Sequence, residues 1–177
     1  VDEDGNDISN AWYDPELNKI VICYALIVET DHKFATYYEN NFPEWSEDEF
    51  YENVDYSLIN IIESVFYHEV GHALVHVYVL PITGMEEDAV DQFSVYMSFA
   101  YPYEDDPENL IGQDTTIDVA IDYYLAAEDA KNSGYEYDET DYADTHSLNE
   151  QRFSNFACWV YGSNSTYNQD ILDAVAE

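Results

Sequence analysis

The chain has 177 residues, of which 46% are apolar, so it is long and apolar enough for one folded domain and is not a disordered acidic tail. Its 39 acidic residues against 4 basic ones give a formal net charge of −35. A surface of this sign repels nucleic acid and anionic membranes, which excludes nucleic-acid binding. Acidity spread along the chain is typical of a surface adapted to high salt. Structural Ca²⁺ at the clusters 2–7 and 104–106, and a preference for basic substrates, are alternative interpretations.

No stretch approaches the ~20 apolar residues that a membrane-spanning helix needs. The two cysteines, Cys23 and Cys158, lie on segments that could pack together, and an acidic, Tyr-rich chain is typical of an extracellular setting. We therefore expect a disulfide between them and a secreted, extracellular or periplasmic location. The oligomeric state stays open, although a Tyr-rich acidic surface could support self-assembly in high salt.

The first part of the chain predicts a β-hairpin after an acidic lead-in at residues 1–10. Two extended segments flank a Pro-containing turn at residues 14–18. The second of them, residues 20–28, is apolar on both faces and is expected to be a strand buried in a sheet. A helix is predicted to start within residues 31–40 and to give way to a surface loop that lasts to residue 56.

The rest of the chain predicts helices. Residues 57–79 are almost all apolar and read as one long buried helix, which Pro81 and Gly84 end. The predicted helices that follow cover residues 86–100, 116–131, 147–161 and 168–176, with an exposed polar stretch at 135–145. Ser147 and Glu150 are expected to form a capping box, and Gly162 to close that helix. The fold class is therefore α+β, as a single domain over residues 11–177.

The segment His68-Glu69-Val70-Gly71-His72 lies in the middle of the predicted long helix. Residues four apart on a helix project side by side, so His68 and His72 can bind one metal ion through their imidazole nitrogens. Glu69 lies on the flank, where its carboxylate can reach a metal-activated water without competing for the metal. The alternative is a pair of core histidines that bond to their neighbours, but burying two His and a Glu is costly unless they are paired or bind metal.

Catalytic zinc usually has three protein ligands and a water, so one more ligand is needed. Glu87 and Asp91 are the better candidates on the next helix: they are four apart, so Glu87 could ligate the metal while Asp91 accepts the other N–H of a ligating histidine. Glu86 is the fallback, and Asp88 is a further acid on the same helix. His76 is collinear with the first two histidines and points progressively away from the metal. An acidic helix N-terminus that faces water is the plain alternative for all these acids.

Several segments together resemble a family of bacterial zinc metallopeptidases classed as a domain of unknown function. They are spread over residues 10–165 and read HEVGHAL at 68–74, GMEEDAVDQF at 84–93, HSLNEQRF at 146–153, AWYDP at 11–15, Cys23-Tyr24 and Cys158-Trp159. The resemblance implies a zincin-like fold in which the hairpin packs on the active-site helix and several helices follow. It also implies a glutamate as third zinc ligand, as in gluzincins, and this role is carried to Glu87. His76 and Met85 depart from the pattern, which puts the substrate preference in doubt.

His146 and Arg152 are candidates for stabilising the transition state, because both residue types are scarce here and Arg152 is the only arginine. A structural ion pair is the alternative role for Arg152. The triplet Asn164-Ser165-Thr166 fits an N-glycosylation acceptor.

The sequence therefore predicts a peptidase with one catalytic Zn²⁺, peptide or protein substrates and Glu69 as general base. Two alternatives remain: a catalytically silent zincin-fold binding or structural protein of the cell surface, and an acidic Ca²⁺-binding module in which the histidines fill a core.

Overall fold

The computed structural model describes residues 8–100 and 110–163. The chain divides into two compact units, Val1–Leu80 and Pro81–Glu177. The first unit holds the two strands and the helices α1 and α2, and the second holds α3, α4 and α5. The described residues are thus mostly helical, with one small antiparallel sheet near the N-terminus, in agreement with the predicted α+β class. The single domain over residues 11–177 stays a prediction.

The predicted hairpin is confirmed. Strand β1 (Ala11–Asp14) pairs with β2 (Lys19–Ile22) in antiparallel register, with Trp12 opposite Val21. Asp14 builds the turn, because its Oδ1 accepts hydrogen bonds from the backbone N–H groups of the second and third residues after it, at 2.9 and 3.0 Å. Asn18 adopts a left-handed conformation with φ of 47°, which its short polar side chain tolerates.

The expected buried strand over residues 20–28 is wrong beyond Ile22. The chain turns at Cys23 into helix α1 (Tyr24–Asn41), in which Tyr24 is 87% and Val28 is 55% exposed. A short apolar run does not distinguish strand from helix by itself. The helical period becomes visible only further along, where the buried residues of α1 recur every fourth position: Thr30, Phe34 and Tyr38.

Helix α2 (Glu47–Tyr78) has 32 residues and begins ten residues before the predicted start at residue 57. Its N-terminus is a capping box: the Ser46 Oγ accepts from the Glu49 N–H at 3.3 Å, and the Ser46 N–H donates to Glu49 Oε2 at 2.9 Å. The acidic first turn also suits the positive end of the helix dipole. The predicted loop up to residue 56 is therefore wrong in its last part.

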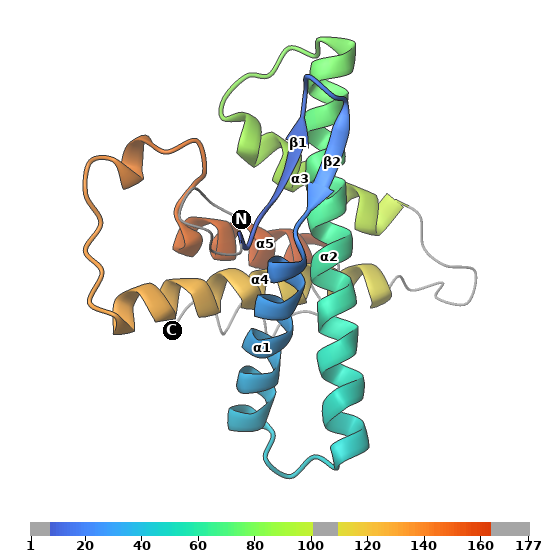
Figure 1. Ribbon diagram of the computed structural model, residues 1–177, viewed down its shortest axis with the longest axis vertical. Helices are drawn as coiled ribbons and strands as arrows, with labels where there is room; N and C mark the ends of the chain where they lie inside the picture. The colour runs from blue at the N-terminus through green and yellow to red at the C-terminus, as the bar shows by residue number, and fades with distance from the viewer. Residues whose placement is uncertain (1–7, 101–109, 164–177) are drawn as a thin grey trace. The chain divides into compact units, whose positions relative to one another are not determined.

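Within the first unit, α1 packs along the N-terminal half of α2, and the hairpin packs along its C-terminal half (Figure 1). The buried Tyr38 hydroxyl lies 2.8 Å from the Ser57 hydroxyl and links α1 to α2. At the other end, the Tyr13 hydroxyl lies 2.9 Å from Nδ1 of His76 and donates a hydrogen bond to the Asn18 side chain. The predicted packing of a hairpin on the long helix is thus confirmed.

The second unit contains α3 (Glu86–Ala100), α4 (Leu110–Asn132), a 3₁₀ turn (Asp141–Ala143) and α5 (Asn149–Ser163). Helices α4 and α5 make its main packing, with α3 against α4 (Figure 1). The buried apolar residues of this pairing are Val119, Ala120, Ala127, Phe156, Ala157 and Val160. The predicted bounds of α3 are confirmed, and the stretch 135–145 is largely exposed, as expected.

Three details of the second unit correct the predictions. Helix α4 begins by residue 110 rather than at 116, because the threonines that follow bond their hydroxyls to carbonyls one turn back and stay helical. Ser147 does not form the expected capping box with Glu150: the N–H of Leu148 donates to the Gln151 side chain at 3.2 Å, and α5 starts at Asn149. Gly162 lies inside α5 instead of ending it.

Several predictions lie outside the described residues. They are most of the lead-in 1–10, the acidic clusters 2–7 and 104–106, the helix 168–176 and the triplet that begins at Asn164. In the part of the chain that the structure describes, no helix is both long and apolar enough to cross a membrane.

Candidate metal centre

The two histidines of the motif lie on adjacent turns of α2. The ring centroids of His68 and His72 are 5.0 Å apart, with the rings tilted by 75°. Both side chains are partly buried, and the helix continues unbroken on either side of them. A long, regular helix is a rigid support, and it holds the two imidazoles at a separation that one ion can bridge.

Glu69 lies between these histidines in the sequence. It is a buried residue, with 6% of its surface exposed. Within the described residues, no hydrogen bond or ion pair of its carboxylate is found, and this distinguishes it from the acids of α3. Glu69 thus combines a buried position with a carboxylate that the described residues leave available, on the helix that bears both histidines. It is the strongest single sign of chemistry in the first unit.

Glu87, in the first turn of α3, is held by a histidine from the segment before α5. Nε2 of His146 lies 3.0 Å from Glu87 Oε2, and the Glu87 side chain is 15% exposed. His146 is fixed on its other side by Asp144, whose Oδ1 lies 3.2 Å from Nδ1 and accepts the His146 backbone N–H at 2.8 Å. The hydrogen bond to Glu87 raises the pKa of His146 above its ordinary value. The two sequence candidates Glu87 and His146 are therefore in direct contact.

Asp91, one turn further along α3, accepts two hydrogen bonds from the Arg152 guanidinium. Nε of Arg152 donates to Oδ2 at 2.9 Å and Nη2 donates to Oδ1 at 2.6 Å. The two side chains are 5% and 13% exposed, so this is a buried ion pair. The guanidinium also lies over the Tyr123 ring of α4, with Cζ 4.1 Å from the centroid. Burial raises the pKa of the Tyr123 phenol well above its ordinary value.

Asp88 has a partner that the sequence did not suggest. The Ser147 hydroxyl donates to Asp88 Oδ1 at 2.8 Å, across 59 positions of the chain. The sequence analysis predicted a helix-capping role for this serine, because Glu150 follows it at the spacing of a capping box. Only the packing of α5 against the other helices of the unit could have revealed the contact.

The two remaining candidates have different surroundings. Glu86 is exposed at the start of α3. His76 lies beside Tyr13 of the hairpin, with ring centroids 5.7 Å apart and the hydrogen bond described above. This contact gives His76 a structural role at the end of α2.

His68 and His72 of the first unit and Glu87 of the second are side chains of the kind that hold a metal ion. Each offers one ligand atom, and all three are partly buried. Two imidazole nitrogens and one carboxylate oxygen are the donor set of many catalytic zinc sites, which leave a fourth position for water. The chemistry of the residues present therefore fits a zinc ion.

The expected disulfide is absent. Cys23 and Cys158 are both free thiols, the first half-buried at the junction of β2 and α1 and the second exposed on α5.

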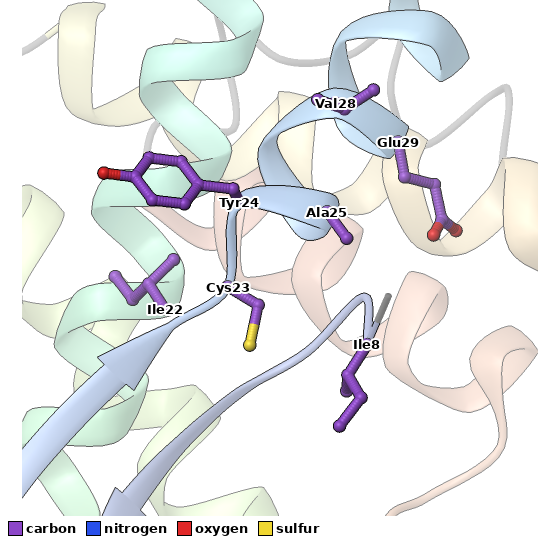
Figure 2. A pocket seen from close by; sticks show the side chains of 7 residues that line it. All are labelled: Ile8, Ile22, Cys23, Tyr24, Ala25, Val28 and Glu29. Carbon is purple, nitrogen blue, oxygen red and sulfur yellow. The ribbon is translucent and has the colours of Figure 1, made fainter. Parts of the chain in front are cut away.

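Cys23 instead lines a hollow of about 510 Å³ in the first unit. Figure 2 shows the side chains around it, which come from the end of β2, from the first turns of α1 and from Ile8 before the hairpin. Its other titratable lining groups are Tyr24 and the Glu29 carboxylate, and none of its lining residues is a histidine. The hollow therefore lacks the donor set of the metal centre.

Comparison with known proteins agrees with this chemistry. No curated protein and no solved structure matches the chain. One family model, described as "Putative metallopeptidase", matches residues 4–177 and so covers nearly the whole chain, including α2, α3 and α5. A match of this extent shows that the chain belongs to this metallopeptidase family.

Proposed function

We propose that the chain is a zinc-dependent peptidase in which His68, His72 and Glu87 bind one zinc ion and Glu69 is the general base. Membership of a metallopeptidase family supports both a metal ion and peptide substrates. The donor set of the three ligands suits zinc, because nitrogen and oxygen donors of this kind are its usual partners in hydrolytic enzymes.

When bound, zinc supplies Lewis acidity, lowering the pKa of a water toward ~7 and polarising the scissile carbonyl. Glu69 then moves the protons. Its carboxylate accepts a proton from the attacking water as the new C–O bond forms, and it returns that proton to the amide nitrogen as the C–N bond breaks. The products are a carboxylic acid and an amine, and Glu69 ends in its starting state.

The observation that carries this proposal is the position of Glu69, a residue only 6% exposed, next to His68 on the helix that bears the two histidines. A structural zinc site would need no such group, since a base contributes nothing to holding the ion.

The test is the substitution Glu69→Gln, which keeps the shape of the side chain and removes its basicity. We expect the variant to bind zinc as the unmodified chain does and to lose peptide hydrolysis by a factor of at least about 10². Glu63→Gln, a half-buried glutamate on the same helix, is the matched control and should keep activity.

Three outcomes would contradict the proposal. Hydrolysis that persists in Glu69→Gln would exclude Glu69 as the base. An unmodified chain that binds zinc but cleaves no peptide would favour the silent zincin-fold protein, and one that binds Ca²⁺ but no transition metal would favour the acidic Ca²⁺ module. Elemental analysis beside the activity assay separates the three.

We further propose a zincin-like arrangement and a secreted or periplasmic location. The first is supported by a hairpin packed on the motif-bearing helix, and the second by the acidic, Tyr-rich composition. The formal net charge of −35 supports a preference for basic peptides, whose attraction would weaken as salt rises.

A further inference from the structure

Three acids at the start of α3 are each held by a residue from one short segment of the chain. Glu87 contacts His146 at 3.0 Å, Asp88 contacts Ser147 at 2.8 Å, and Asp91 receives two hydrogen bonds from Arg152. All the partners lie within the second unit, at the entry and in the first turn of α5. His146, Ser147 and Arg152 are called the carboxylate clamp below.

The clamp is itself supported on both sides. Asp144 holds the His146 ring and backbone, as described above. Tyr137 donates its hydroxyl to the Glu150 carboxylate at 2.9 Å and so ties the preceding loop to α5. On the far side, the Arg152 guanidinium lies over the Tyr123 ring. Neither His146 nor Arg152 can therefore change its position without breaking several contacts.

These contacts change the roles that the sequence suggested for two residues. Arg152 directs two of its donors at Asp91 and is 13% exposed, which is the geometry of a structural ion pair. His146 directs Nε2 at Glu87, so it acts through that carboxylate. We infer that His146, Ser147 and Arg152 are positioning residues that hold α3 and the Glu87 carboxylate in the orientation that metal binding needs.

The inference rests on the proposed function, because it assumes that Glu87 is a metal ligand. Its physical basis is entropic. Ordering a glutamate side chain costs conformational entropy, and a carboxylate that is already held loses less freedom when the ion binds. Removing a partner that orients a ligand typically lowers metal affinity by about 10–100-fold.

The experiment measures the zinc dissociation constant of the full chain by competition with a chromogenic chelator, with no substrate present. His146→Ala should weaken zinc binding by about tenfold or more, and His146→Gln, whose amide keeps a donor, should restore part of the loss. His32→Ala is the matched control, since His32 is an exposed histidine of α1 in the other unit. It should leave the affinity unchanged.

A second variant protects the test against misfolding. Asp144 is exposed, with 58% of its side chain accessible, so Asp144→Ala should fold, and it removes the group that fixes the His146 ring. We expect a smaller but measurable loss of zinc affinity, while Asp129→Ala, an exposed aspartate of α4, has no effect. The thermal midpoint of the metal-free chain, measured in parallel, should change little for Asp144→Ala. A purely structural role would instead lower that midpoint and leave the affinity alone.

The outcomes separate the two proposals. If the unmodified chain binds zinc but His146→Ala and Asp144→Ala bind it equally well, the clamp is overturned and the proposed function stands. Tighter binding by His146→Ala would also overturn it, because the histidine would then compete with the metal for Glu87. An unmodified chain that binds no zinc would overturn the proposed function itself.

Discussion

Arg152 donates two parallel hydrogen bonds to Asp91, from Nε at 2.9 Å and from Nη2 at 2.6 Å; Asp91 is buried and only 13% of the Arg152 side chain is exposed. This fork-to-carboxylate geometry needs the planar guanidinium of arginine, which lysine cannot reproduce. Arg152 is the only arginine of the chain, which has 39 acidic residues. The pair therefore has structural consequences for the second unit that can be measured without any metal.

Removing Arg152 leaves the Asp91 carboxylate buried without its cation. Arg152→Ala should lower the free energy of unfolding by about 3–5 kcal/mol, and Arg152→Lys should recover part of that loss. Lys131→Ala is the control: the Lys131 side chain is 74% exposed and pairs with Glu128 at the surface, so its loss should cost no more than about 1 kcal/mol. Urea unfolding followed by circular dichroism measures all three. Equal effects of Arg152→Ala and Lys131→Ala would mean that the buried pair contributes nothing.

Zinc should stabilise the chain through Glu87 and not through Glu86. At a free zinc concentration about 100 times the dissociation constant, binding adds about 2.7 kcal/mol, which raises the thermal midpoint by about 5–10 °C. Glu87→Gln should reduce this rise strongly, and a chelator should abolish it in the unmodified chain. Glu86→Gln, the same substitution at the exposed neighbour, should keep the rise. A rise that survives Glu87→Gln and disappears in Glu86→Gln would reverse the assignment of the third ligand.

The sequence predicted those features that depend on local signals. Helix α3 was placed correctly at 86–100, because an acidic first turn and a following Pro102 mark its ends. The middle of α2 was also placed correctly, since an uninterrupted apolar run of that length has few alternatives. The turn at residues 14–18 carried its own signature in Asp14 and Pro15.

The failures have identifiable physical causes. Residues 20–28 are apolar on all sides, so neither the strand period nor the helix period is visible in them, and the switch at Cys23 could not be located. The start of α2 was recoverable, because Ser46 and Glu49 have the spacing of a capping box. The contacts of the carboxylate clamp were not recoverable: Ser147 to Asp88 and Arg152 to Asp91 join residues 59 and 61 positions apart, and only packing brings them together.

Tyr137 makes the stability of the second unit depend on pH in the alkaline range. Burial and its hydrogen bond to Glu150 raise the pKa of Tyr137 from 10.0 to about 12. Because the folded pKa lies above the unfolded one, the contribution of this phenol to stability is complete below pH 10 and is lost as the pH rises to about 12. Tyr137→Phe should flatten the fall in the free energy of unfolding across this window. Tyr51→Phe, at an exposed position of α2, should leave the profile unchanged, and the same profile in both variants would exclude this role for Tyr137.

Val79 ends α2 in a conformation that its side chain disfavours. Its φ of 52° and ψ of 48° are left-handed, and its backbone N–H caps the helix by bonding to the carbonyls of Val75 and His76. A branched side chain in this region costs roughly 1–2 kcal/mol, while the exposed fraction of 85% shows that the side chain gains little from packing. Glycine removes the clash and keeps the N–H, at the expense of a more flexible unfolded chain.

Val79→Gly should therefore raise the free energy of unfolding by about 0.5–1 kcal/mol. The matched control is Val77→Gly, the same substitution two residues earlier and at a similarly exposed site, where the backbone is helical and glycine should lower stability by a comparable amount. Thermal unfolding of both variants, measured with and without zinc, provides the comparison. Opposite signs would locate the strain in the backbone of residue 79. A loss of stability in both variants would mean that the left-handed backbone of residue 79 carries no strain. The contacts of the valine side chain would then stabilise the fold by more than its conformation costs.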